Sequence, residues 1–118
     1  MKREDIERYE ELLSKLMSIK KDIAALSSKK PGEQLNKFKI KYVNDVLTKI
    51  NDLIGTDKPY DDDFEAFDED ALPTNSDALM IINLYINGMH RFKTHNSSDQ
   101  SIDFDWTQKE RVWNIEDE

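Results

Sequence analysis

Apolar residues recur at steps of three and four through the first half of the chain, and this spacing is typical of amphipathic helices. In the first series, between Glu4 and Leu26, they are Ile6, Tyr9, Leu13, Leu16, Ile19 or Ile23, and Leu26. The following SSKKPGE reads as a turn, because Pro31 disfavours helix at the residue before it and suits the first turn of a new helix. The pattern therefore predicts two antiparallel helices, the second running from near Pro31 to about Ile54.

Apolar residues of the second helix cover a wider arc than one neighbouring element can bury. They are Leu35, Phe38, Tyr42, Val43, Val46, Leu47, Ile50, Leu53 and Ile54. We expect this helix to pack against two elements, with Leu47 and, on the first helix, Leu13 in the core. Gly55 is well placed to end it, since glycine adopts positive φ without a steric penalty.

A third helix is predicted from about Asn75 to Lys93. Thr74 suits its N-cap, and Asp77 lies near the positive end of the helix dipole. The run ALMIINLYI in its first half is also compatible with a buried strand, because a continuous apolar run has no decisive period. The cap and the length of the pattern favour the helix.

The C-terminal segment changes period. Ile102, Phe104 and Trp106 alternate with polar residues, as do Trp113 and Ile115, which predicts a small β-hairpin. A short helix or a free tail is the alternative. Because a two-stranded ribbon needs support in water, both tryptophans are expected to be partly shielded by the helices.

These patterns predict one mainly α domain over residues 1–118. Its fold class is a helical bundle of three long helices plus a short acidic helix, with a small C-terminal β-hairpin or extended tail. The parts are a helical hairpin (1–55), an acidic segment (56–74), a third long helix (75–95), and a linker with a Trp-containing tail (96–118).

The net charge of −8 is unevenly distributed. Met1 to Gly55 holds 12 Lys and Arg against 9 Asp and Glu, or +3, whereas Thr56 to Glu118 holds 5 against 16, or −11. Such an acidic half repels phosphate backbones and attracts basic surfaces. We therefore expect no direct binding of nucleic acid through that half.

The acidic charge is densest in KPYDDDFEAFDEDALP, from Lys58 to Pro73. Here Tyr60, Phe64 and Phe67 are spaced to share one side of a short helix, which would leave the carboxylates outside. We predict that an ordered acidic surface contacts a partner, together with the nearby aromatics and the two tryptophans. The predicted partner-binding residues are Asp61, Asp62, Asp63, Phe64, Glu65, Phe67, Asp68, Glu69, Asp70, Trp106 and Trp113.

Few residues point to enzymatic chemistry. The chain has no cysteine, and its three glycines, at 32, 55 and 88, form no phosphate-binding loop or nucleophile elbow. His90 and His95 are five apart and not in the i, i+4 spacing of a zinc pair, and the acidic stretch lacks the glycine of a calcium loop. We assign no catalytic residue, metal site or cofactor.

The resulting hypothesis is a non-enzymatic interaction protein, monomeric or a small oligomer, that binds and inhibits a basic protein such as a nucleic-acid-handling enzyme. It would be an immunity-type protein or a nucleic-acid mimic. The alternatives are a helical scaffold or oligomer subunit, and a small metal-dependent enzyme using acid pairs such as Glu7 with Glu10. With charges where a signal peptide needs an apolar core and no run long enough for a membrane span, we expect a cytoplasmic protein without membrane contacts.

Overall fold

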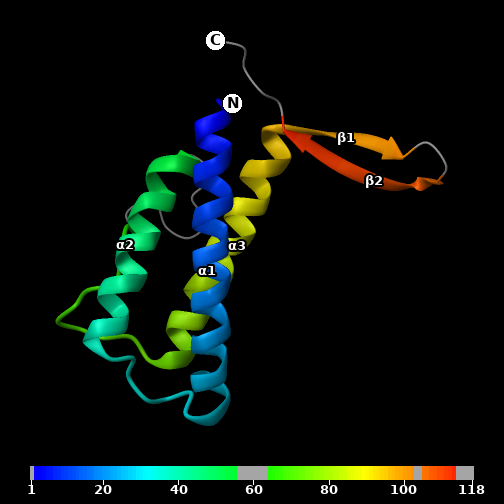
Figure 1. Cartoon of the computed structure of the whole chain (residues 1–118). Helices are drawn as coiled ribbons and strands as arrows, with labels where there is room; N and C mark the ends of the chain where they lie inside the picture. The colour runs from blue at the N-terminus through cyan, green and yellow to red at the C-terminus, as the bar shows by residue number, and fades with distance from the viewer. Residues whose placement is uncertain (1, 56–63, 103–104, 114–118) are drawn as a thin grey trace.

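A computed structural model describes residues 2–55, 64–102 and 105–113, with side chains described outside 98–112. Its elements are α1 (Arg3–Lys29), α2 (Lys37–Ile54), α3 (Asn75–His95), β1 (Ser97–Ile102) and β2 (Asp105–Trp113) (Figure 1). The predicted mainly α fold with three long helices is confirmed. The predicted short acidic helix is absent from its described part, since residues 64–74 form no helix and include a turn at Glu69 and Asp70.

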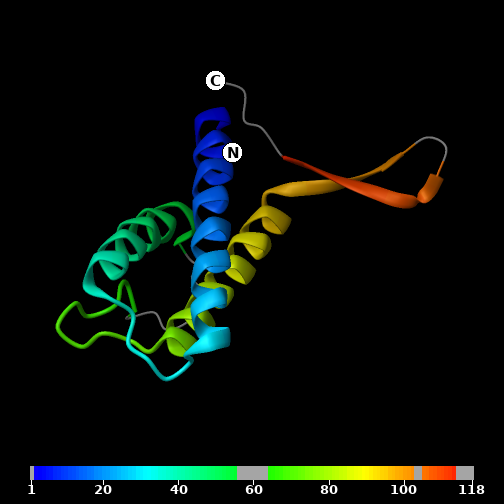
Figure 2. The ribbon, with the colours of Figure 1, turned by 60° about the horizontal axis from the view of Figure 1, so that its bottom comes forward.

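The three helices share one hydrophobic core. In both ribbon views α1 lies between the other two helices (Figures 1 and 2), and it packs more extensively against α3 than against α2. Each helix contributes one apolar stripe, as the three- and four-residue spacing requires. The fully buried large side chains are Tyr9, Tyr85, Leu16, Leu35, Ile40, Leu47, Ile50, Ile82, Met89, Val43 and Val46.

The second helix begins later than the sequence predicted. It starts at Lys37, and the side chain of Asn36 accepts a hydrogen bond from the backbone N–H of Lys39 at 2.8 Å. Residues 31–36 instead form a connector, in which the buried Leu35 donates its N–H to the carbonyl of Pro73 at 2.9 Å. This long-range pairing holds the backbone extended. It outweighs the tendency of the residues after Pro31 to form a helix.

Both ends of the polypeptide between α2 and α3 match the predicted signals. Gly55 follows α2 with φ of 51°, the positive value that favours glycine. The hydroxyl of Thr74 accepts a hydrogen bond from the N–H of Asp77 at 3.2 Å and so caps α3. The strand alternative for ALMIINLYI is wrong, because the whole run lies inside α3.

Strands β1 and β2 pair antiparallel from Ser97 opposite Trp113 to Ser101 opposite Lys109, with a shift in register beyond Ser101. The ribbon leaves the end of α3 and projects away from the helices (Figures 1 and 2). At its base, Trp113 is half-buried against the helical core.

Two aromatic residues of α2 depart from the expected packing. Phe38 is 83% exposed and Tyr42 is 50% exposed, so the wide apolar arc of this helix is only partly covered. Among the described residues, no helix is both long enough and apolar enough to cross a membrane.

Candidate functional site

The described part of the acidic segment runs along α2 as irregular backbone, held by asparagine side chains. Asn44 accepts a hydrogen bond from the N–H of Phe67 at 2.8 Å and donates one to its carbonyl at 2.9 Å. Seven residues further along α2, Asn51 donates to the carbonyl of Glu65 at 2.9 Å. A spacing of seven is close to two helical turns, so both amides lie on the same side of α2.

The second of these asparagines is itself positioned by α3. The buried hydroxyl of Tyr85 donates a hydrogen bond of 2.7 Å to the side-chain oxygen of Asn51. Burial raises the pKa of Tyr85 above its usual value, and the nearby Glu65 carboxylate raises it further. The phenol is therefore kept protonated as a donor. Neither asparagine was predicted from the sequence as part of the site, and their one signal is the spacing of two amides seven residues apart in α2.

The two phenylalanines of the segment point toward the protein. Phe64 and Phe67 pack edge to face with ring centroids 5.5 Å apart, and Phe64 lies 6.3 Å from the ring of Tyr85. Both are half-buried against the core. They anchor the segment, while their predicted contact with a partner stays a prediction.

The carboxylates face solvent. Glu65, Asp68, Glu69 and Asp70 are all exposed, and a tight turn orders the last three. In this turn the carboxylate of Asp68 accepts from the N–H of Asp70 at 2.8 Å, and its backbone carbonyl accepts from Ala71 at 3.2 Å. The predicted site residues Asp61, Asp62 and Asp63 lie outside the described residues.

The C-terminal end of the segment is tied to the connector before α2. Besides the bond from Leu35 to Pro73, the N–H of Asn75 donates to Glu33 at 2.8 Å and its side-chain amide donates to Lys30 at 2.9 Å. Residues 64–74 are thus held by α2 at Glu65 and Phe67 and by the connector at Pro73. The conformation of these residues is set by the bundle and not by local helix propensity.

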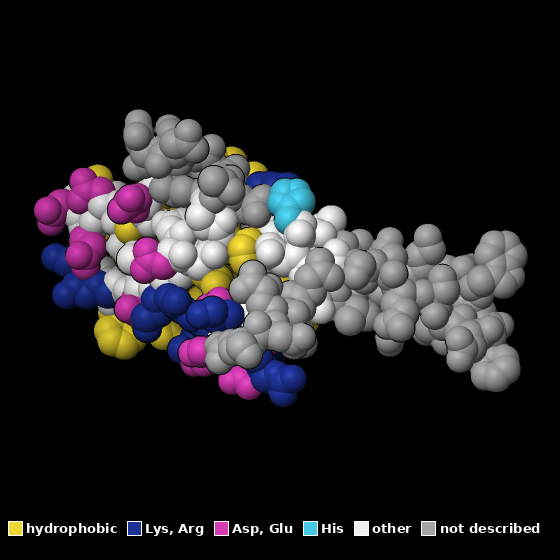
Figure 3. Space-filling model, turned by 90° about the horizontal axis from the view of Figure 1, so that it is seen from above, with side chains coloured by type: hydrophobic (Ala, Val, Ile, Leu, Met, Phe, Trp, Pro, Cys, Tyr) yellow, Lys and Arg dark blue, Asp and Glu magenta, His cyan; other side chains and the backbone are white. Residues whose placement is uncertain are grey.

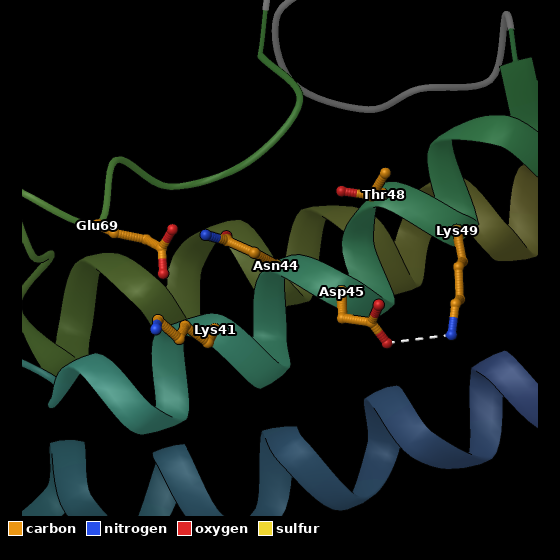
Figure 4. A pocket seen from close by; sticks show the side chains of 6 residues that line it. All are labelled: Lys41, Asn44, Asp45, Thr48, Lys49 and Glu69. Carbon is orange, nitrogen blue, oxygen red and sulfur yellow. Dashed lines mark hydrogen bonds and ion pairs between the residues drawn. The ribbon is translucent and has the colours of Figure 1, made fainter.

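An open hollow of about 470 Å³ lies between α2 and this segment (Figure 4). Lys41 and Glu69 project toward each other across it, while Lys49 pairs with Asp45 at 3.1 Å. Thr48 and Asn44 complete its lining. The lining of this open hollow therefore combines side chains of both charges.

The remaining predicted sites are scattered. Trp113 packs edge-on against Tyr9 with centroids 4.8 Å apart, far along the chain from the acidic segment, and the side chain of Trp106 lies outside the described part. His90 and His95 are both exposed. Within the described residues, no group of three or more His, Cys, Asp or Glu side chains lies close enough to hold a metal ion.

Charge on the helical body is mixed when the molecule is seen from above. In Figure 3, Lys and Arg side chains lie among Asp and Glu side chains, with apolar groups between them. Residues 65–70 differ from this pattern, since they include four acidic residues and no basic residue.

Comparison with known proteins gave no relative. No protein-family model, no curated protein and no solved structure matches this chain.

Proposed function

We propose that this protein binds a basic protein partner through the acidic segment and inhibits it, as an immunity-type protein or a nucleic-acid mimic. The observation that carries the proposal is the tether: Asn44 and Asn51 fix the backbone of residues 65–67 while the neighbouring carboxylates stay exposed. An acidic loop kept only for solubility has no need of such anchoring.

Preorganisation explains why the tether matters for binding. Ordering a loop at an interface lowers affinity, and a segment already ordered in the free protein avoids that loss. Its carboxylates also repel one another, so the folded protein accepts some electrostatic strain that a basic surface would relieve. Complementary charge further raises the rate of encounter with such a surface.

Nucleic-acid-handling enzymes fit the partner chemistry. Their basic grooves bind regularly spaced phosphates, and a fixed row of carboxylates offers charges of the same sign. Inhibition would result because the bound protein blocks that groove.

The test compares two variants of equal net charge. The segment variant carries Glu65→Gln, Asp68→Asn, Glu69→Gln and Asp70→Asn. The matched control neutralises four exposed acids on the helices, namely Glu4→Gln, Glu7→Gln, Glu11→Gln and Asp52→Asn. Immobilised wild type and both variants are used to capture proteins from a lysate of the source cells, and association rates with the purified partner are then measured across an ionic-strength series.

We expect wild type and control to retain the same basic protein, and the segment variant to lose it or to associate much more slowly at low salt. The difference should shrink as salt rises, because steering is screened over about 10 Å at 0.1 M ionic strength. Equal retention by the segment variant, or capture of no basic protein, would reject the proposal.

A further inference from the structure

A separate apolar surface lies on the seam between α1 and α2. Ile19, Ile23 and Val43 line a hollow of about 350 Å³ there. Two exposed aromatic residues of α2 form part of the same lining, namely Phe38, which is 83% exposed, and Tyr42. Contiguous exposed apolar surface rimmed by polar residues is a common mark of an interaction site.

This seam is distinct from the acidic segment. Phe38 precedes Asn44 by six residues, which turns it about 120° around the axis of α2. The hollow on the seam shares no lining residue with the hollow that Lys41 and Glu69 flank. A ligand on one surface therefore leaves the other accessible.

We propose that the seam binds the same seam of a second copy of this chain, giving a two-fold symmetric dimer. A two-fold interface needs one patch that complements itself. Here the exposed ring of Phe38 adjoins the hollow, so Phe38 of each copy enters the hollow of the other. A two-fold axis parallel to the seam achieves this, because it sets α1 of each copy against α2 of its neighbour.

The same two-fold rotation also brings opposite charges at the hollow together. Asp22 lines it from α1 and Lys39 lines it from α2. Both are described residues, yet no ion pair joins them within the chain. The axis brings Asp22 of one copy to Lys39 of the other, twice per dimer.

The distribution of net charge also favours a second copy at this face. Residues 1–55, which form both walls, carry +3, whereas the rest of the chain carries −11. A dimer through α1 and α2 therefore joins the two nearly neutral halves and keeps the acidic segments exposed. Association through the acidic half would bring like charges together.

The first experiment measures the mass of the full chain by sedimentation equilibrium from low to high micromolar concentration. Wild type should form a reversible dimer, and Phe38→Ser should raise its dissociation constant at least about thirtyfold, the effect of losing a buried aromatic anchor. Met80→Ser is the matched control, because Met80 is a 52% exposed apolar residue on α3. Since both replaced side chains are largely exposed, thermal unfolding should confirm that both variants fold.

The second experiment tests the pairing itself. Asp22→Lys places four positive charges at the interface and Lys39→Asp places four negative charges there, so each variant alone should be monomeric. An equimolar mixture of the two should form a heterodimer. In it, the two positive side chains of one chain, at positions 22 and 39, meet the two negative side chains at the same positions of the other.

A wild type that is monomeric at every concentration would overturn the inference, and the seam would then be open to a different partner. If Phe38→Ser left the dissociation constant unchanged, or if the two charge variants did not pair when mixed, the dimer would use a surface other than the seam. No basic partner is present in these measurements, so their outcome is independent of the proposed inhibitory function.

Discussion

Asn44 in α2 takes the place of a neighbouring strand for Phe67, accepting from its N–H at 2.8 Å and donating to its carbonyl at 2.9 Å. Backbone outside helices and sheets must satisfy its polar groups elsewhere when it packs on a protein surface. One side-chain amide does so for both groups of a residue, because it offers an acceptor and two donors. Residues 65–67 can therefore lie ordered against a helix.

Replacing Asn44 by alanine should release the middle of the segment. Both bonds to Phe67 are lost together, and we expect the free energy of unfolding to fall by about 1–3 kcal/mol. Amide hydrogen exchange at Phe67 should accelerate. Thr48→Ala, an exposed neighbour one turn further along α2, is the control and should leave this amide protected. Unchanged exchange in Asn44→Ala would show that Phe64 and Phe67 hold the segment unaided.

Alanine in place of Leu12 should be much more damaging than alanine in place of Leu13. Leu12 is 3% exposed in the core, whereas Leu13 is only half-buried at its edge. We expect Leu12→Ala to lower the free energy of unfolding by about 2–5 kcal/mol, with a clearly smaller loss for Leu13→Ala. Urea unfolding of the two variants makes the comparison. Equal losses would mean that Leu12 and Leu13 are buried to the same degree.

Leu12 and Leu13 also show how far periodicity predicts a core. The spacing identified α1 as a helix, but adjacent leucines fit the same apolar stripe nearly equally well, and Leu13 was expected in the core. Which one is buried depends on how α1 sits between α2 and α3, and that is a property of the assembled bundle. The exposure of Phe38 has the same origin, because periodicity assigns a face without saying whether a neighbour covers it.

Local signals were sufficient where the decisive bond is local. Thr74 caps α3 through a residue three positions away, and Gly55 ends α2 through its own φ. The start of α2 and the path of the acidic segment depend instead on partners far along the chain. Leu35 bonds Pro73, and Asn44 bonds Phe67, 23 residues away. A spacing that fits a helix, as between Phe64 and Phe67, carries no information about such partners.

Trp113 is expected to fasten the base of the ribbon to the helices. Its ring lies edge-on to Tyr9 at 4.8 Å, its indole N–H donates to the carboxylate of Glu10 at 3.3 Å, and the ammonium of Lys93 lies 5.4 Å from its centroid. Trp113→Ala should lower the free energy of unfolding by about 2 kcal/mol or more. Glu10→Gln keeps an acceptor for the indole and should have a small effect. A wild-type urea midpoint for Trp113→Ala would mean that the ribbon is not docked.

Tyr9 lies at the centre of this contact and is fully buried. Its hydroxyl donates a 2.7 Å hydrogen bond to the carbonyl of Met89, and its ring stacks on Phe92 with centroids 5.9 Å apart. Burial, and secondly the negative charge of Glu10, raise the pKa of Tyr9 from 10.0 to about 12. The folded protein thus holds a proton that the unfolded chain releases at lower pH.

This shift predicts alkaline destabilisation in a defined window. Because the pKa of Tyr9 is raised in the folded protein, the contribution of this hydroxyl to stability is fully present below pH 10. It is lost as the pH rises toward 12. The total loss from Tyr9 is about 2–3 kcal/mol, since each unit of pKa corresponds to about 1.4 kcal/mol. Urea unfolding across this range should give a steeper fall in the free energy of unfolding for wild type than for Tyr9→Phe.

The raised pKa of Tyr85 adds a second contribution, so Tyr9→Phe with Tyr85→Phe should flatten the profile further. Parallel profiles for wild type and Tyr9→Phe would show that the phenol ionises as readily in the folded protein as in the unfolded chain, and would place Tyr9 in contact with water.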